Sequence, residues 1–444
     1  MAQNFLSCDR DQVMLLPPDM SEWLPSEHLA RFVIELVDQL DLSEIYGYYR
    51  QDGHGRPAHD PAMMTALVLY SYALGVRSSR VIERRCVEDV ACRVISANRQ
   101  PDHATIARFR ARHQAALSWL FFEVLAMCRE AGMAQVGTVA VDSTKLAANA
   151  SLEANRTADQ LRAEAERILV EAAEVDARED ELYGERRGDE LPEALADPRT
   201  RAARIRELLE RVHEREREVE SARAQMHARR EEHEQRTGRR LVGRPPAAAP
   251  AYKQRRTLAK KHNLTDPDSG IVRHRGMLMQ GYNIQTAVAE GQIILATQVT
   301  GVASDAAQLA ATVELASENL ARAGITEPIS EVLADAGYWN TEQVGQLQDQ
   351  GLRVLVPPRE RVAASPERLH PTARQMTAAL ATDAGKDAYR RRQQIVEPVF
   401  AGWKHIRGIT RVLRRGKTAV QAEVDLIATT HNLLKLYRHR LAIA

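Results

Sequence analysis

The chain has 444 residues, of which 44% are hydrophobic, 27% charged and 5% aromatic. This composition indicates a globular protein of two or three domains and excludes a disordered chain, a collagen-like fibre and a bundle of membrane helices. The 61 basic and 60 acidic residues give a net charge of +1, which argues against a nucleic-acid partner unless the charges are segregated along the chain.

Cysteine usage and the N-terminus predict the compartment. The four cysteines, Cys8, Cys86, Cys92 and Cys128, form no C-x-x-C pair, and we expect free thiols in a reducing cytoplasm. Residues 1–10 lack a basic segment followed by an apolar run, and no apolar stretch approaches the roughly 20 residues of a membrane span. The sequence therefore predicts a soluble, cytoplasmic protein without a membrane association.

Residues 1–134 are predicted to form a helical N-terminal domain. Pro61 suits the first turn of one helix, and Asp102 is a good N-cap for another. We expect helices over Ala62–Leu74, Ser79–Val94 and Ala104–His113. The last of them carries Arg108, Arg110 and Arg112. Short helices with a basic last member resemble a helix-turn-helix, so two readings stay open: contact with DNA, or a solvated arginine face.

The middle of the chain changes character twice. The β-branched run 136–142 predicts a buried strand that ends at Asp142. Apolar residues then recur every seven positions in 157–182 and in 199–236, with glycines and prolines between the two segments. This pattern predicts an inserted antiparallel helical hairpin, followed by a Pro/Ala linker at 244–250. Either a dimerisation or spacer element, or contacts with a partner or with DNA ends, would explain it.

An α/β pattern follows from Met277. We expect strands over Met277–Ala289, Gln292–Val299, Ile329–Asp335 and Leu352–Val356, and helices over Asp305–Ala323, Thr341–Gln350, Asp387–Trp403 and Gln421–Tyr437. The Glu290–Gly291 pair is a plausible hairpin turn. Pro398 should lie near a kink or a boundary of its helix.

Three carboxylates in this pattern could carry chemistry. Asp142 and Asp335 end apolar strands, and Glu397 lies in a late helix. Each aspartate could merely cap the turn that follows it. If the three converge, their mutual repulsion requires a divalent cation, and hard oxygen ligands select Mg²⁺ or Mn²⁺. Two such ions about 4 Å apart can activate an attacking oxygen and stabilise the leaving oxygen of a phosphodiester.

Several motifs make the sequence recognisable. They are VAVDSTKLAANAS at 139–151, LADAGYW at 333–339, IVEPVFAGWK at 395–404, NLTDPDS at 263–269, QGYNIQTAV at 280–288 and PDHATIARFR at 101–110. In this order they resemble the bacterial insertion-sequence transposases of the DDE superfamily. The resemblance implies an α/β fold with a ribonuclease H-like mixed sheet and flanking helices, an all-α N-terminal domain and an inserted helical hairpin.

The resemblance also assigns roles and domains. It places the catalytic and metal-binding triad on Asp142, Asp335 and Glu397, with two Mg²⁺ or Mn²⁺ ions as cofactors. We expect a helical N-terminal DNA-binding domain at 1–134, the first part of the catalytic core at 135–155, the inserted hairpin and linker at 156–250, and the rest of the core with a basic C-terminal segment at 251–444.

Positive charge is concentrated around the expected glutamate. Residues 389–440 contain twelve basic and three acidic residues, a net charge of +9, which suits a track for phosphates better than a solvated face. Relatives carry a Tyr-x₂-Arg-x₃-Glu-x₆-Lys signature. Lys404 keeps the spacing from Glu397, whereas Tyr389 and Arg392 lie one residue too far away.

The expected DNA-binding residues follow from the charge and the signature. They are Lys404, Arg392, Arg407, Arg411, Arg414, Arg415, Lys417, Arg108, Arg110, Arg112 and Trp339. Trp339, Trp403 and Tyr338 could stack on an unpaired base at a cleaved end, or could be ordinary core aromatics.

The sequence thus predicts a DNA-binding DDE transposase. It would cleave transposon ends as a metal-dependent endonuclease and join the 3′-hydroxyl to target DNA, as a nucleoid-associated bacterial protein that forms a homodimer in the synaptic complex. The alternatives are a metal-dependent nuclease without strand transfer and a domesticated, inactive DNA-binding protein.

Overall fold

A computed structural model of the chain describes residues 22–49, 57–157, 160–161, 163, 198–237, 262–274, 276–358 and 370–443. The helices before the first strand are α1 (Leu29–Val37), α2 (Ser43–Gly47), α3 (Pro61–Ala73), α4 (Ser79–Glu88), α5 (Val90–Ile95), α6 (His103–Arg112) and α7 (Gln114–Glu130). They form the helical N-terminal region that the sequence predicts.

Local capping explains how these helices begin. Asp60 accepts a hydrogen bond from the Met63 amide at 2.8 Å, directly before Pro61 at the start of α3. Asp102 caps α6 through the Thr105 amide at 2.9 Å. The single helix expected over Ser79–Val94 is wrong, because Asp89 adopts an extended conformation and caps a new helix, α5, through the Cys92 amide.

The sheet is mixed, with β1 in its interior. The strands are β1 (Gln135–Ala147), β4 (Gly270–His274), β5 (Met277–Glu290), β6 (Ile293–Thr300), β7 (Glu331–Ala334) and β8 (Arg353–Leu355). Their order is β4-β5-β1-β7-β8, and β6 also pairs with β5. β1 pairs antiparallel with β5 and parallel with β7. This order confirms the predicted ribonuclease H-like mixed sheet.

Strand β1 is longer than the sequence predicts. It does not end at Asp142 but continues to Ala147, because β5 pairs with it over its whole second half, up to Gly281. Asp142 therefore lies within the strand. The hairpin between β5 and β6 is confirmed, with positive φ angles of 80° at Gly291 and 66° at Gln292.

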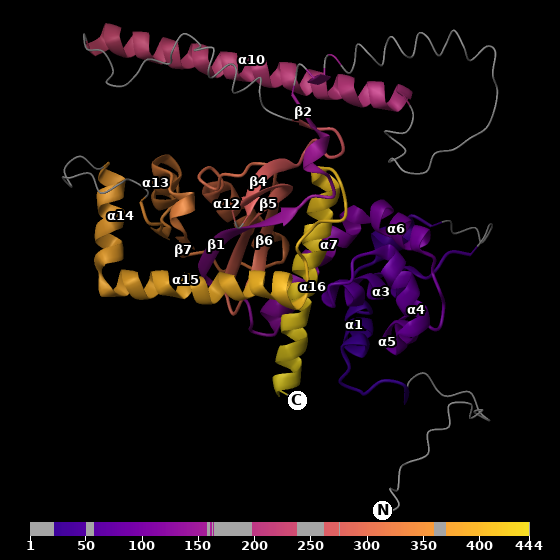
Figure 1. Ribbon diagram of the computed structural model, residues 1–444. Helices are drawn as coiled ribbons and strands as arrows, with labels where there is room; N and C mark the ends of the chain where they lie inside the picture. The colour runs from indigo at the N-terminus through magenta and orange to yellow at the C-terminus, as the bar shows by residue number, and fades with distance from the viewer. Residues whose placement is uncertain are drawn as a thin grey trace, which may run out of the picture.

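The later helices cover the sheet and join it to the N-terminal region. They are α12 (Leu309–Arg322), α13 (Thr341–Asp349), α14 (Pro371–Ala381), α15 (Asp383–Ala401) and α16 (Lys417–Ile443), with short 3₁₀ turns η2 (Leu152–Ala154) and η3 (Ala336–Tyr338) and a π-helical turn η5 (Gly402–Ile406). α12 packs on β5 and β6, α15 crosses β1, β5 and β7, and α16 packs against β6, α7 and α3 (Figure 1).

Two buried contacts hold the N-terminal helices to the C-terminal part. Glu423 of α16 accepts a charge-assisted hydrogen bond from Arg77 at 2.5 Å, with the Glu423 side chain fully buried. Arg407 donates to the Tyr72 carbonyl at 2.7 Å. The buried apolar side chains of α1, α3, α7, α16 and the sheet belong to one hydrophobic cluster, so the two regions share a single core.

The insertion begins and ends at one short ladder. β2 (Asn155–Arg156) pairs antiparallel with β3 (His262–Asn263). The second arm of the predicted hairpin is helix α10 (Pro198–Thr237), 40 residues long, which lies along one side of the molecule (Figure 1). Most of the first arm and the linker at 244–250 lie outside the described residues, so the hairpin as a whole stays a prediction.

Two expectations about compartment can be compared with the fold. No helix within the described ranges is long and apolar enough to cross a membrane. Cys86, Cys92 and Cys128 are buried free thiols, and burial raises the pKa of each, to about 11 for Cys86 and about 12 for the other two. Cys8 lies outside the described residues.

Candidate active site

Two of the three predicted carboxylates come from neighbouring parallel strands. Val141 of β1 lies opposite Ala334 of β7 in the ladder. Asp142 is the next residue of β1, and Asp335 directly follows β7 in an extended conformation, so the register brings the two residues side by side at the same edge of the two strands. The sheet topology therefore produces the aspartate pair that strand ends alone could only suggest.

The two aspartates make different local contacts. Asp142 Oδ1 accepts a hydrogen bond from the Ser143 amide at 2.7 Å, and Oδ2 accepts one from Arg392 Nη1 of α15 at 2.9 Å. Asp335 Oδ1 accepts from the Gly337 amide at 2.7 Å and caps η3. The capping role considered for Asp335 is thus real, and it leaves the second oxygen of that carboxylate available.

Burial raises the pKa of Asp142, and the nearby charge of Asp335 raises it further, whereas the Ser143 amide and the Arg392 guanidinium lower it. Two like charges in a partly buried place favour a cation between them. The oxygen-only donors of an aspartate pair are also the ligands that Mg²⁺ and Mn²⁺ prefer. The pair fits a divalent cation on both grounds.

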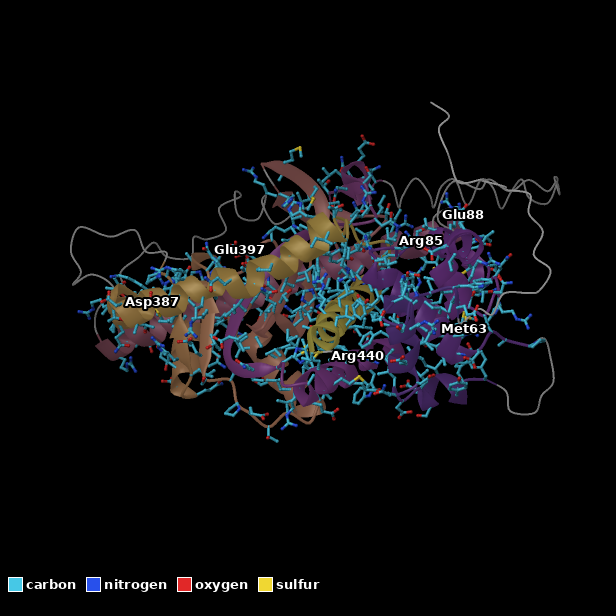
Figure 2. The ribbon with its side chains drawn as sticks, turned by 90° about the horizontal axis from the view of Figure 1, so that it is seen from below. Met63, Arg85, Glu88, Asp387, Glu397 and Arg440 are labelled. Atoms are coloured by element: carbon cyan, nitrogen blue, oxygen red, sulfur yellow. The ribbon has the colours of Figure 1, made fainter. Side chains whose placement is uncertain are left out.

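Glu397 is not part of this pair. It lies on α15 (Figure 2), exposed, while Arg392, Val396 and Val399 form part of the buried face of that helix. Among the described residues, no three His, Cys, Asp or Glu side chains are grouped so as to hold a metal ion. The structure thus brings together two of the three predicted metal ligands and leaves Glu397 apart from them.

Three of the predicted DNA contacts make hydrogen bonds within the fold. Arg407 is buried and donates to the Ile427 and Tyr72 carbonyls, and burial beside Arg77 lowers its pKa to about 9. Arg110 donates to the Tyr72 hydroxyl and the Arg77 carbonyl. Arg414 donates to Gln114, and its burial lowers its pKa.

Burial argues against base stacking on the predicted aromatic residues. Trp339 is 8% exposed, and Trp403 and Tyr338 are fully buried. The Tyr338 hydroxyl donates to Gln285 inside the sheet region. These rings belong to the core, which was the alternative reading of the sequence, and a DNA contact of Trp339 stays an untested prediction.

The remaining predicted contacts are exposed or half-exposed. They are Arg108, Arg112, Arg411, Arg415 and Lys417, which are exposed, and Lys404, which is half-exposed in η5. Arg112 stacks 4.7 Å above the centre of the Tyr48 ring, and Arg415 donates to the Asn149 carbonyl. Arg411 pairs with Ala147, the last residue of β1, so this basic loop lies at the end of β1 that follows Asp142, five residues beyond it.

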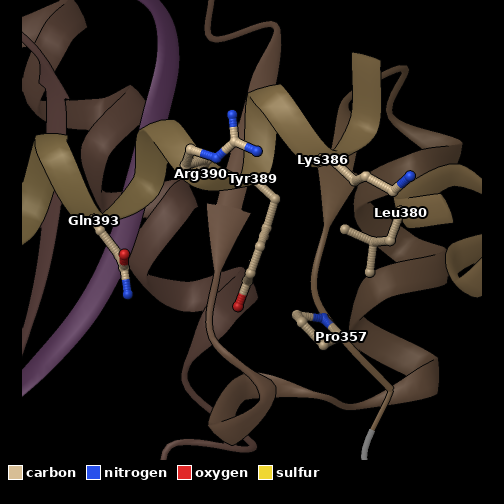
Figure 3. A pocket seen from close by; sticks show the side chains of 6 residues that line it. All are labelled: Pro357, Leu380, Lys386, Tyr389, Arg390 and Gln393. Atoms are coloured by element: carbon tan, nitrogen blue, oxygen red, sulfur yellow. The ribbon is translucent and has the colours of Figure 1, made fainter. Parts of the chain in front are cut away.

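The structure contains a cavity beside α15 that sequence reasoning missed. Its volume is about 440 Å³ and it is lined by Pro357, Leu380, Lys386, Tyr389, Arg390 and Gln393. Tyr389 projects from α15 toward Pro357 (Figure 3). Arg392, which contacts Asp142, lies with its Cζ 5.8 Å from the centre of the Tyr389 ring, so one arginine links the cavity-lining ring to Asp142. Burial raises the pKa of Tyr389, and the charges of Asp335 and Asp142 contribute to the shift. The Tyr-x₂-Arg spacing of 389 and 392 was the available signal.

Comparisons with known proteins bear on both ends of the chain. A family profile described as a transposase domain (DUF772) matches residues 18–112, and one described as a transposase DDE domain matches residues 356–437. The first match covers α1 to α6, and the second contains Glu397 and Lys404. No curated protein and no solved structure gives a significant match.

Proposed function

The chain is an insertion-sequence transposase of the DDE superfamily, and on this premise we propose that Asp142, Asp335 and Glu397 catalyse cleavage of transposon ends and their joining to target DNA. The observation that carries the proposal is the aspartate pair, which the β1–β7 register brings together. Glu397 is included because it lies within the matched DDE segment, on the same helix as the arginine that contacts Asp142.

The chemistry is a pair of phosphoryl transfers. Two Mg²⁺ or Mn²⁺ ions held by these carboxylates would activate the attacking oxygen and stabilise the leaving one. In the first transfer, water attacks a phosphodiester at the transposon end, the P–O3′ bond breaks, and a free 3′-hydroxyl remains. In the second, that hydroxyl attacks a target phosphodiester and a target 3′-hydroxyl leaves. The carboxylates supply the oxygen ligands throughout.

The exposed basic residues are the proposed DNA contacts. Arg411 and Arg415 lie near the end of β1 that follows Asp142, and Arg108 and Arg112 lie on α6 of the N-terminal region. Contacts from both regions would fix the register of one duplex across the site. Tyr389, rather than Trp339, is the aromatic ring that borders a cavity at the site. Because two ends must be held together, we propose a homodimer as the active form, acting at the bacterial nucleoid.

The test replaces each carboxylate by its amide. Asp142→Asn, Asp335→Asn and Glu397→Gln should each reduce cleavage of an end-containing duplex in Mg²⁺ by about 10³-fold or more, because each loses a ligand charge. Binding of the same duplex, measured by gel shift, should change little. Asp387→Asn is the matched control, since Asp387 is an exposed acid of α15 that pairs with Arg390.

The outcomes separate the alternatives. Full activity in any of the three amide variants would contradict the assignment of that residue. Cleavage without joined products would identify a metal-dependent nuclease, and binding without nicking under any condition would identify an inactive DNA-binding protein.

A further inference from the structure

The Asp142 carboxylate is already in contact with a cation of the protein itself. Arg392 Nη1 lies 2.9 Å from Oδ2, with side-chain exposures of 10% for Arg392 and 20% for Asp142. The other oxygen, Oδ1, accepts the Ser143 amide. A divalent cation at the aspartate pair needs an oxygen of Asp142. The Ser143 amide already binds Oδ1, and Arg392 binds Oδ2, the oxygen that makes no backbone hydrogen bond.

The helix that carries Arg392 is fixed to the sheet by its neighbour. Arg391 donates to Glu290 at 2.8 Å and to Glu331 at 3.0 Å. These contacts join α15 to β5 and β7, on either side of β1. Release of Asp142 therefore requires only a change of the Arg392 side chain, with the helix in place.

The hydrogen-bond donors of the Arg392 guanidinium are only partly used in this position. Its Nε is buried and has no hydrogen-bond partner within the described part of the chain, and its Cζ lies 5.8 Å from the centre of the Tyr389 ring. A buried unpaired donor is unfavourable, and a guanidinium forms its strongest hydrogen bonds with a bidentate acceptor such as phosphate. Tyr389, Lys386 and Arg390 line a cavity next to this ring. The two cationic side chains each pair with an exposed aspartate and could contact a phosphate from there.

We propose that Arg392 is an exchangeable counter-cation: it holds Asp142 Oδ2 in the absence of DNA, and a DNA phosphate beside Tyr389 draws it away and opens Asp142 to the divalent cation. This inference rests on the proposed function, because it needs DNA at this site. It makes DNA binding and cation binding mutually favourable, and by linkage each raises the affinity of the other by the same factor. Arg392 is then a positioning residue that prevents cation loading before DNA is present.

The test measures Mn²⁺ binding to the full chain by electron paramagnetic resonance of free Mn²⁺, with and without an end-containing duplex. In the wild type, the duplex should tighten Mn²⁺ binding about tenfold or more. Arg392→Gln should bind Mn²⁺ several-fold more tightly than the wild type without DNA, and the effect of the duplex should shrink toward onefold. Arg392→Lys keeps a charge and should restore part of the effect. Arg322→Gln on α12, where Arg322 pairs with Glu318, is the matched control.

The outcomes distinguish this inference from the proposed function. Asp142→Asn should abolish the tight Mn²⁺ site; if it does not, the metal site itself is wrong, and the exchange with it. If Asp142→Asn abolishes the site but the wild type and Arg392→Gln bind Mn²⁺ equally without DNA, only the exchange is overturned. If the duplex tightens Mn²⁺ binding equally in the wild type and in Arg392→Gln, the exchange is overturned as well. Melting temperatures of the two proteins confirm that both are folded.

Discussion

At the scale of single residues, Asp425 of α16 is a carboxyl outside the site whose pKa is strongly raised. It accepts hydrogen bonds from Gln421 at 2.7 Å and from Thr297 at 3.1 Å. Burial raises its pKa from 3.8 to about 6, although hydrogen bonds from Gln421, Ser118 and Thr297 lower it. The folded protein therefore binds a proton at Asp425 over a pH range in which the unfolded chain has lost it.

This difference predicts a pH-dependent contribution to stability. Because the folded pKa is the higher one, ionisation of Asp425 favours the unfolded chain, and stability from this group is lost as the pH rises from about 4 to about 6. Asp425→Asn mimics the neutral carboxyl. Relative to the wild type, its free energy of unfolding should rise by roughly 2 kcal/mol between pH 4 and pH 7. Urea unfolding at several pH values measures this.

The control for that experiment is Asp383→Asn, because the Asp383 side chain is 99% exposed and its loss should leave the pH profile unchanged. Parallel pH profiles for the wild type and Asp425→Asn would refute the prediction.

Single residues also show what the sequence could predict about the site. Asp142 and Asp335 follow apolar runs, so their positions beside buried strands could be read directly. Arg407 and Arg415, in contrast, belong to the same basic segment, yet one is buried and the other exposed. The difference arises from the contact between Arg407 and Tyr72, 335 positions apart in the chain. Local charge carries no information about such a contact.

At the scale of elements, α15 contains a proline that another element compensates. Pro398 lies within the helix and has no N–H to donate to the carbonyl of Gln394, four residues earlier. The side-chain amide of Gln292, in the β5–β6 hairpin, donates to that carbonyl at 3.3 Å. A residue of the β5–β6 turn thus replaces the missing helical hydrogen bond. The proline lies three residues before the end of α15 at Ala401, which agrees with the expectation that it lies near a kink or a boundary.

A double-mutant cycle tests this compensation. Gln292→Ala should lower the free energy of unfolding by about 0.5–1 kcal/mol more in the wild type than in a Pro398→Ala background, where the alanine N–H can donate to Gln394. The contact of Gln292 with Lys435 is lost in both backgrounds and cancels. Denaturant unfolding of the four proteins measures the difference, and an equal effect of Gln292→Ala in both backgrounds would exclude the compensation.

The predicted boundary of an element was wrong where a contact with another part of the chain sets it. The sequence predicts β1 only to Asp142, because the polar residues that follow break the apolar run. The strand continues because β5 supplies hydrogen bonds as far as Ala147. Periodicity detects burial within a segment and cannot show where a partner strand ends. The succession of the other strands along the chain was predicted, whereas β4 (Gly270–His274), at the edge of the sheet, was missed.

At the scale of the whole molecule, the insertion between β2 and β3 is joined to the core at a single place. Arg156 and His262 lie opposite each other in the ladder, so the chain leaves the core and returns to it at one place. Leu161, Ile205, Leu208 and Leu264 form a small cluster of their own. Arg211 of α10 also pairs with Asp268 at 2.8 Å. These contacts with the core are few compared with the shared core of the N-terminal helices and the sheet.

We therefore predict that residues 157–261 can be replaced by Asn-Gly, which closes a two-residue hairpin between Arg156 and His262. The shortened chain should melt cooperatively within about 5 °C of the full chain, because the contacts described between the insertion and the core are the small cluster and the Arg211 ion pair. An Ala-Pro closure is the control and should melt lower, since proline cannot adopt the positive φ that the turn requires. Aggregation or a non-cooperative melt of the Asn-Gly variant would show that the insertion is part of the core.

The same variant also tests the role of the insertion, by sedimentation and by binding of end DNA. Loss of self-association indicates a dimerisation element, loss of DNA binding indicates contacts with the transposon ends, and no change indicates a spacer.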